Sequence, residues 1–217
     1  MLRDPHRMAG FDSQLSITTR TWWSMHPRER GTMMIFKKGD VETYTGQKVN
    51  VLDPVGSTIN IEDIAHALSL QCRFNGHCRE VYTIADHCLN GVELMRRSGC
   101  STADRLGFLL HDAAEAYIGD IVTPVKELIS EWYAPVEKRL HDVILLRLCP
   151  KGFTYDVEKI KGFDLLMLKM ESFDLMTSRG RGWGWDWTDM NAEINEVEDS
   201  ETVFISTYNQ LMKGLRR

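Results

Sequence analysis

The sequence predicts a mainly α-helical protein, a helical bundle with a small N-terminal β-meander. From Ile61 onward, apolar residues recur at helical spacing through most of the chain. Before that point, short apolar runs are separated by turn-forming residues such as Lys38-Gly39-Asp40 and Gly46-Gln47, which is typical of short strands. With 217 residues and 43% hydrophobic content, the chain is long enough to bury one full core.

The expected elements follow from these patterns. The strands are predicted at 33–36, 41–44 and 49–52. The helices are predicted at 61–71, 80–97, 102–117, 124–129, 131–148, 156–177 and 199–214. We expect a single globular domain with three parts: an arm and small β appendage (1–60), the helical core (61–177), and a Trp/Gly loop with a C-terminal helix (178–217).

Composition excludes several classes of protein. A net charge of −5 without any basic run argues against duplex nucleic acid as the main partner. The apolar runs are too short for a membrane span, and the first residues lack a secretory apolar core, so we expect no membrane association and a cytoplasmic location. Five cysteines without a CxxC pair favour free thiols.

The run from His111 to Glu115 is the most informative part of the chain. On a continuous helix, His111, Asp112 and Glu115 would share the side opposite the apolar residues. A solvated charged face is the ordinary reading of such a pattern. Small and apolar neighbours such as Phe108 occupy most of the same side, however, so these polar groups are expected to be buried and to need partners. A metal ion would satisfy them.

Two further residues complete a ligand set. His87 lies at the edge of a helical apolar stripe, and Asp164 lies among the apolar residues of the segment 157–176. Considered singly, His87 reads as a core histidine and Asp164 as a packing or capping residue. Together with His111 and Asp112 they form a mixed nitrogen and oxygen set suited to one divalent transition metal ion. Mn, Fe, Co, Ni and Zn all remain open.

The order His87, His111-Asp112, Asp164 resembles the HD-domain metal-dependent phosphohydrolases over about residues 60–176. It is most similar to the bacterial 5′-deoxynucleotidase branch and to related phage deoxynucleoside triphosphohydrolases of the dATPase type. The run from His111 to Asp120, followed by Thr123-Pro124-Val125-Lys126, resembles the catalytic helix and exit loop of that branch. Arg73-Phe74 resembles its Arg-aromatic pair. The helical core is therefore expected to be an HD-domain bundle.

The resemblance implies hydrolysis of a 5′-deoxynucleotide by water that attacks the α-phosphorus. Glu115 would be the catalytic acid or base, the alternative being a hydrogen bond to a metal ligand. Arg73 is the candidate catalytic and phosphate-binding residue, because the geometry of a guanidinium group suits a phosphate. Asp120 is expected to accept the 3′-hydroxyl, or else to cap a helix beginning near Val122. Phe74 is expected to crowd the 2′ position, although the closest bacterial enzymes carry tryptophan there.

Three more residues are candidate substrate contacts. They are Lys126, Lys161 and His77; the lysines could equally be surface residues and His77 could pack locally. The two lysines and Arg73 are three cations, which is more than one phosphate group needs. The sequence therefore favours release of triphosphate from a deoxynucleoside triphosphate. A monophosphate 5′-deoxynucleotidase is the alternative, and a non-catalytic nucleotide-sensing HD module is the remote one.

The expected cofactors and partners follow from this hypothesis. They are one divalent transition metal ion, with Mg²⁺ on the substrate phosphates as a further option, and a small-molecule nucleotide. We also expect a homo-oligomer. The Trp/Gly tract 178–187 is interpreted as a flap packed over the helices or as a subunit contact, rather than as a single-strand nucleic-acid platform.

Overall fold

The computed structural model describes residues 36–185 and 194–216, and within these residues the protein is mainly helical, which confirms the predicted class. The helices are α1 (Ile61–Leu70), α2 (Ile84–Arg97), α3 (Thr102–Leu109), α4 (Glu115–Ile118), α5 (Thr123–Leu128), α6 (Ser130–Leu148), α7 (Val157–Leu175) and α8 (Ser200–Leu215). The strands are β1 (Asp40–Glu42) and β2 (Lys48–Asn50), and two 3₁₀ turns occupy Gly56–Thr58 and Arg73–Gly76.

The N-terminal β structure is an antiparallel hairpin in which Val41 pairs with Val49. Of the three predicted strands, the second and third are present in shortened form, while residues 33–35 of the first lie outside the described residues. Val49 is fully buried in the helical core, and so is Ile59 after the hairpin. Residues 36–60 therefore belong to the same compact unit as the helices, which spans Phe36–Arg217.

Side-chain caps explain where several helices begin. In each case, the side chain of the residue before the helix accepts a hydrogen bond from a backbone N–H of the first turn, which would otherwise have no partner. These residues are Asn60, Thr83, Ser101, Asp156 and Asp199. Helix α2 accordingly begins at Ile84, four residues later than the start predicted at 80.

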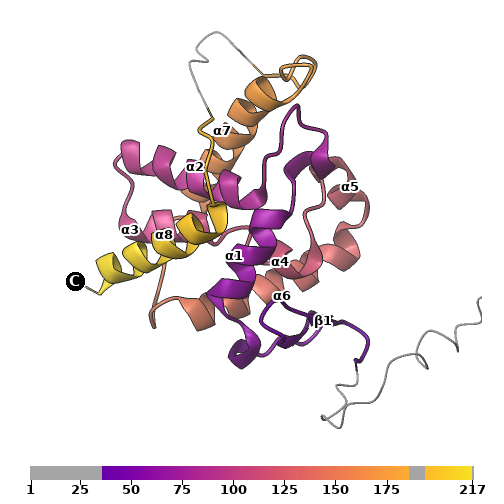
Figure 1. Cartoon of the computed structure of the whole chain (residues 1–217), viewed down its shortest axis with the longest axis vertical. Coiled ribbons are helices and arrows are strands. Elements are labelled where there is room, and N and C mark those ends of the chain that lie inside the picture. The colour runs from indigo at the N-terminus through magenta and orange to yellow at the C-terminus, as the bar shows by residue number, and fades with distance from the viewer. Residues whose placement is uncertain (1–35, 186–193, 217) are drawn as a thin grey trace, which may run out of the picture. The chain divides into compact units, whose positions relative to one another are not determined.

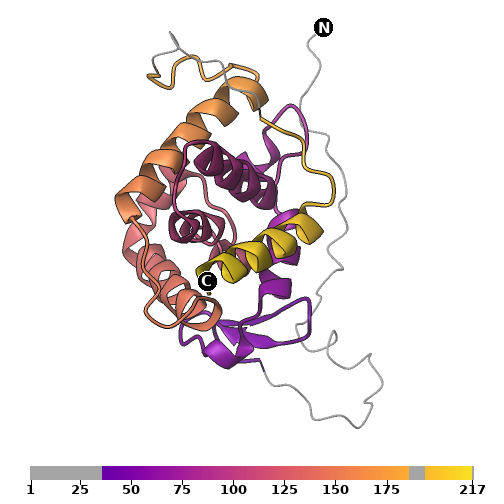
Figure 2. The same ribbon diagram turned by 90° about the vertical axis from the view of Figure 1, so that its left-hand side faces the viewer.

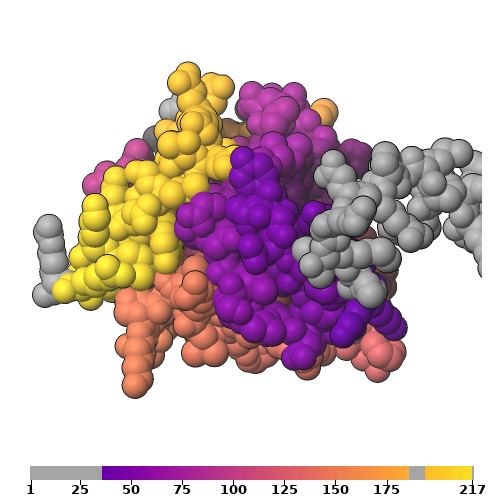
Figure 3. Space-filling view, turned by 60° about the horizontal axis from the view of Figure 1, so that its bottom comes forward, coloured from indigo at the N-terminus to yellow at the C-terminus, as the bar shows by residue number. Residues whose placement is uncertain are grey.

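Helices α2 and α3 form the centre of the bundle. They contact each other, and both contact α7 on one side and α8 on the other, while α1 contacts α2 and α8. Figures 1 and 2 show this arrangement, with α7 (orange) and α8 (yellow) on either side of the central pair. In the space-filling view of Figure 3, α8 lies alongside α1 (purple). The two central helices carry or lead directly into three of the four predicted metal ligands.

One close approach fixes the distance between the central helices. A side-chain carbon on Gly91 of α2 would lie 2.0 Å from Cε1 of Phe108 on α3, so only glycine fits at this position. The fully buried Phe108 ring lies next to both predicted histidine ligands, with ring centroids 5.7 Å from His87 and 4.5 Å from His111. Core packing between α2 and α3 thus sets the position of both imidazoles.

The prediction of one continuous helix over 102–117 is wrong. Helix α3 ends at Leu109, and the chain continues in tight turns until α4 begins at Glu115. The N–H groups of His111 and Glu115 donate to carbonyls three residues earlier, those of Phe108 and Asp112, as in a 3₁₀ helix. Hydrophobic periodicity did not reveal this change, because the predicted apolar residues of the segment are buried in either conformation.

Two compositional expectations bear on the rest of the molecule. All five cysteines are free thiols, as predicted. Among the described residues, no helix has both the length and the apolar character of a membrane span.

Candidate metal centre and adjoining cavity

His87 lies one turn into α2 and is completely buried. Its position follows from the capping box at the start of this helix. The Thr83 hydroxyl accepts a hydrogen bond from the N–H of Asp86 (3.1 Å), and the Asp86 carboxylate accepts one from the N–H of Thr83 (2.8 Å). This reciprocal pair orients the first turn of α2 and hence the imidazole that follows it.

The structure brings the four predicted ligands together. The His87 Nε2 atom lies 3.2 Å from Asp164 Oδ1 and 3.7 Å from Asp112 Oδ2. The His111 Nε2 atom lies 3.2 Å from Asp112 Oδ2 and 3.6 Å from Asp164 Oδ1. The two Nε2 atoms are 3.3 Å apart. His87 and Asp164 come from α2 and α7, and the His111-Asp112 pair comes from the turn after α3, so residues far apart in sequence converge at one point.

Hydrogen bonds at the other ring nitrogens define the imidazole tautomers. The His111 Nδ1 atom donates to the carbonyl of Phe108 (2.7 Å), because a carbonyl can only accept. The His87 Nδ1 atom lies 2.5 Å from Oε1 of Glu171. Burial would raise the pKa of Glu171, but the charges of Arg73 and His87 outweigh it and lower that pKa to about 2. Glu171 is therefore an ionised acceptor, and both Nε2 atoms point into the cluster, where they can hold a proton or a metal ion.

This geometry fits a divalent metal ion. Donor atoms at adjacent positions around an ion with bonds of about 2.0–2.2 Å lie about 3.0–3.6 Å apart, close to the observed contacts. His87, His111 and Asp112 alone form a group whose donor atoms are all within 4.8 Å of one another and could hold a metal. A proton or a metal cation at this point offsets the repulsion that two Nε2 lone pairs 3.3 Å apart would otherwise have. The metal identity is not specified by these donors.

Electrostatics around the cluster favour positive charge. Burial disfavours the protonated form of His111, yet the carboxylates of Asp112 and Asp164 outweigh it and raise the pKa of His111 well above its usual value. Burial likewise acts to raise the pKa of Asp164, but hydrogen bonds to His111 and His87 hold it far below its usual value. The same field that stabilises a proton at Nε2 also attracts a metal cation.

Glu171 is the functional residue that the sequence analysis missed. It is completely buried on α7 and accepts hydrogen bonds from Tyr82 Oη (3.0 Å) and Arg73 Nε (3.2 Å) as well as its bond with His87. A signal existed in the sequence. Glu171 follows Asp164 by two helical turns within the same apolar segment, so the burial argument applied to Asp164 applied equally to Glu171.

A cavity of about 530 Å³ adjoins the cluster, a size typical of small-molecule sites. Asp112 and Asp164 reach its wall, so the candidate metal centre faces it. Its lining includes six more of the predicted site residues: Arg73, Phe74, His77, Glu115, Asp120 and Lys126. Apolar side chains, among them Leu168 and Met176, complete the wall.

Glu115 is a buried carboxyl group whose Oε2 atom has no hydrogen-bond partner. Its nearest cation is Lys126, whose Nζ lies 3.9 Å from Oε1. Burial, reinforced by the negative charges of Asp112 and Asp120, raises the pKa of Glu115 well above its usual value. A carboxyl group that keeps its proton near neutral pH and lines a cavity is suited to proton transfer.

The predicted cations differ in where they lie. Arg73 has a mostly buried side chain, 11% exposed, and its Nη1 atom lies 3.6 Å from Asp112 Oδ2 at the edge of the cluster. Lys126 reaches the cavity from α5 and pairs with Glu137. Lys161 does not line the cavity: it is exposed on α7 and pairs with Glu158, one turn earlier (2.8 Å). The expected substrate contact by Lys161 is therefore not supported, because its side chain lies along the outer face of the helix.

Phe74, His77 and Asp120 line the same cavity. Phe74 has a left-handed backbone (φ 53°), which places its ring at the cavity wall 6.2 Å from the ring of Trp183. Trp183 belongs to the tract 178–187 and lines the same cavity. Asp120 does not cap a helix: α5 begins at Thr123, and no side chain caps it. Burial raises the pKa of Asp120 above its usual value.

Comparison with known proteins finds relatives but no matching family profile. The chain is 36% identical over 134 residues to an uncharacterized protein of Rhodobacter capsulatus, a match that covers 59% of this chain and 68% of that protein. It is 34% identical over 142 residues to the uncharacterized protein YfdR of Escherichia coli K12, covering 62% of this chain and 71% of YfdR. More than two thirds of each relative is thus matched.

Proposed function

The chain belongs to the same family as these two proteins, and we propose that it is a metal-dependent phosphohydrolase of deoxynucleoside 5′-phosphates. One observation carries the proposal. The imidazoles of His87 and His111 each form a hydrogen bond at Nδ1, and their Nε2 atoms point at two carboxylates beside a cavity. The resemblance of these ligands to the HD-domain pattern supplies the reaction class.

The metal centre would be formed by His87, His111, Asp112 and Asp164. A divalent ion held there supplies two things to hydrolysis: a water of lowered pKa and neutralisation of charge on a phosphoryl oxygen. The chain's own residues do the rest. Glu171 keeps the His87 ring in its ligating tautomer, and the Phe108 carbonyl does the same for His111.

Glu115 is the proposed proton carrier. Its raised pKa means that it holds a proton when substrate arrives, and Oε2 has no competing partner within the described residues. Donating this proton to the 5′-oxygen as its bond to phosphorus breaks leaves the carboxylate, which Lys126 at 3.9 Å stabilises. The alternative role, a fixed hydrogen bond to a metal ligand, is less favoured because no such bond is present.

Phosphate binding is assigned to Arg73, with Lys126 as the second cation. Arg73 already lies against Asp112, so a phosphoryl group beside that ligand comes within reach of its guanidinium. Asp120 is the proposed acceptor for the sugar 3′-hydroxyl. Phe74 and Trp183 form an aromatic edge of the cavity, against which the sugar and base would pack.

The length of the phosphate chain separates two candidate reactions. The preference for a triphosphate depended on three cations, and Lys161 lies outside the cavity. Arg73 and Lys126 remain, each already paired with carboxylates, which is enough for a single phosphate. This observation favours hydrolysis of monophosphates more than the sequence did, and the triphosphohydrolase stays a prediction that rests on Lys126 alone.

The test combines metal analysis with a substrate panel. The wild-type protein, loaded separately with Mn²⁺, Co²⁺ and Zn²⁺, is incubated with deoxynucleoside mono- and triphosphates, dAMP and dATP first, and the products are separated. We expect deoxynucleoside with phosphate or intact triphosphate as co-product. Asp112→Ala should lose both metal and turnover while its circular dichroism stays helical. A folded Asp112→Ala protein with full metal occupancy would contradict the metal centre, and metal-loaded wild type without any turnover would favour a nucleotide-sensing module.

A further inference from the structure

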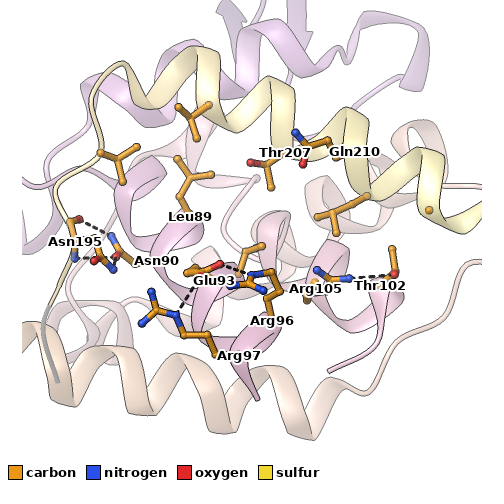
Figure 4. Close-up of a pocket in the computed structure, with 15 residues that line it drawn as sticks. Leu89, Asn90, Glu93, Arg96, Arg97, Thr102, Arg105, Asn195, Thr207 and Gln210 are labelled. Carbon is orange, nitrogen blue, oxygen red and sulfur yellow. Dashed lines mark hydrogen bonds and ion pairs between the residues drawn. The ribbon is translucent and has the colours of Figure 1, made fainter. Parts of the chain in front are cut away.

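A second cavity, of about 460 Å³, lies between α2, α3 and α8 (Figure 4). It shares no lining residue with the cavity beside the metal ligands. One wall includes the segment after residue 194, held to α2 by a reciprocal pair: Asn195 N–H donates to Asn90 Oδ1 (3.0 Å), and Asn90 Nδ2 donates to the Asn195 carbonyl (3.0 Å). The cavity is thus lined by three helices and by the anchored segment that contains Asn195.

Positive charge predominates in this cavity. Its charged lining consists of three arginines, Arg96, Arg97 and Arg105, and one acid, Glu93. Glu93 accepts hydrogen bonds from Arg96 Nε (2.6 Å) and Arg97 Nε (2.8 Å), so one carboxylate holds two guanidinium groups in place. Three positive charges against one negative leave a surplus of two positive charges. The whole chain has a net charge of −5, so this local excess of positive charge favours binding of an anion.

Arg105 has unused donors. Its Nη2 atom donates to Thr102 Oγ1 (3.2 Å), while its Nε atom is buried and has no hydrogen-bond partner. Within the described part of the chain, no carboxylate lies within ion-pair distance of this guanidinium. A guanidinium carries five N–H donors in a planar fork, and buried donors are normally satisfied. The Arg105 guanidinium lines the cavity and has more donors than its one bond to Thr102 uses, which suits a ligand with acceptor oxygens.

The uncharged lining contains both polar and apolar side chains. The apolar ones include Leu89 and Val92 of α2 and Val203 and Leu211 of α8. Such walls favour an organic group over a bare inorganic ion, because an apolar portion of the ligand gains from leaving water. The lining therefore combines cationic, uncharged polar and apolar side chains.

We propose that this cavity is a binding site for a small organic phosphate, a phosphate monoester with an apolar or ring-shaped portion. A monoester carries about −1.5 to −2 charges near neutral pH, which matches the surplus of two. Its oxygens accept from the Arg105 guanidinium, which lines the cavity, and from the guanidinium groups that Glu93 positions. A monocarboxylate would leave one positive charge uncompensated. The proposal does not depend on the catalytic assignment, because the two cavities have separate linings.

Methyl-resolved NMR distinguishes the two cavities directly. Metal-free protein labelled at Leu and Val methyl groups is titrated with phenyl phosphate, with inorganic phosphate and benzoate as matched probes. Val203 and Leu211 report on the proposed site, and Val122 and Leu168 report on the cavity beside the metal ligands. We expect saturable shifts at Val203 and Leu211, with phenyl phosphate binding more tightly than either matched probe.

Variants test the assignment of the residues. Arg105→Gln should weaken binding about tenfold or more, since it removes a charge-assisted hydrogen bond. Val203→Trp fills the apolar side without changing charge and should also abolish the shifts at Leu211. Lys138→Gln, which removes an exposed cation of α6, should bind as the wild type does. Shifts confined to Val122 and Leu168, unchanged affinity in Arg105→Gln, or no shift up to about 10 mM ligand would each overturn the proposal.

Discussion

Replacing Glu115 with glutamine is expected to stabilise the metal-free protein while removing its turnover. The carboxyl group is buried, one of its oxygens has no partner, and its pKa is raised by burial and by Asp112 and Asp120. The native protein therefore keeps a proton on Glu115, whereas the unfolded chain loses it above the usual pKa of 4.5. Glutamine has the same shape as the protonated acid and no charge to bury.

The sign and size of the effect follow from proton linkage. Because the folded pKa is raised, the stabilisation from protonation is complete below pH 4.5 and is lost as the pH rises toward the folded pKa. Within that window, wild-type stability falls by up to about 1.4 kcal/mol per pH unit relative to the glutamine variant. At neutral pH, about 2.5 units above the unfolded pKa of 4.5, linkage sets an upper bound of about 3 kcal/mol on this gain.

Urea unfolding of both proteins in EDTA, at about pH 5 and about pH 8, measures this difference. The advantage of Glu115→Gln should widen with pH. In the metal-loaded protein, the same variant should keep its metal and lose about 10²-fold or more in turnover, because an amide cannot deliver a proton. A variant less stable than wild type at both pH values, or an advantage that does not change with pH, refutes the electrostatic argument. Near-normal turnover refutes the proton-transfer role.

Three further substitutions test the surrounding structure. Glu171→Gln should weaken metal binding about 10–100-fold, measured by competition with a chelator, because His87 loses its charged acceptor; unchanged affinity would contradict that support. Lys126→Ala should reduce use of dATP more than use of dAMP if triphosphate is the substrate, and an equal loss on both would count against the longer chain. Gly91→Ala should destabilise by about 1–3 kcal/mol, because its side-chain carbon would overlap a core ring, whereas Gly162→Ala in open space on α7 should be neutral or stabilising; equal unfolding free energies for the two variants would contradict the packing argument.

Sequence periodicity predicted the helices well where a helix has one buried face and a recognisable start. Asn60 is a residue of the type that caps helices, and α1 begins directly after it, where its start was predicted. Thr83 is of the same type, but the start of α2 was predicted four residues before Ile84. Periodicity failed between Leu109 and Glu115, where the backbone tightens into 3₁₀ turns. The core requires buried side chains there in both conformations, so an apolar pattern contains no information about which one the backbone adopts.

The candidate site divides in a similar way. The four metal ligands were found because buried histidines and carboxylates need partners, and the resemblance to a known pattern ordered them. Contacts made by long side chains were not accessible to the same reasoning. Lys126 and Lys161 look alike in sequence, yet one reaches the cavity and the other pairs with Glu158 on the outer face of α7. That choice depends on the direction of each helix in the folded bundle, which spacing does not specify.

Glu171 connects two parts of the site that the sequence treated as separate. Its Oε1 atom contacts the Nδ1 atom of His87, and its Oε2 atom contacts Arg73. The residue proposed to ligate metal and the residue proposed to bind phosphate thus share one buried carboxylate. When a phosphoryl group binds Arg73, the guanidinium compensates less of the negative charge of Glu171. That charge then acts more strongly on His87 and makes its imidazole a stronger metal ligand. Substrate binding and metal binding are therefore expected to favour each other through Glu171. Arg73 and His87 compete for its negative charge, and a bound phosphoryl group weakens the hold of Arg73 on it.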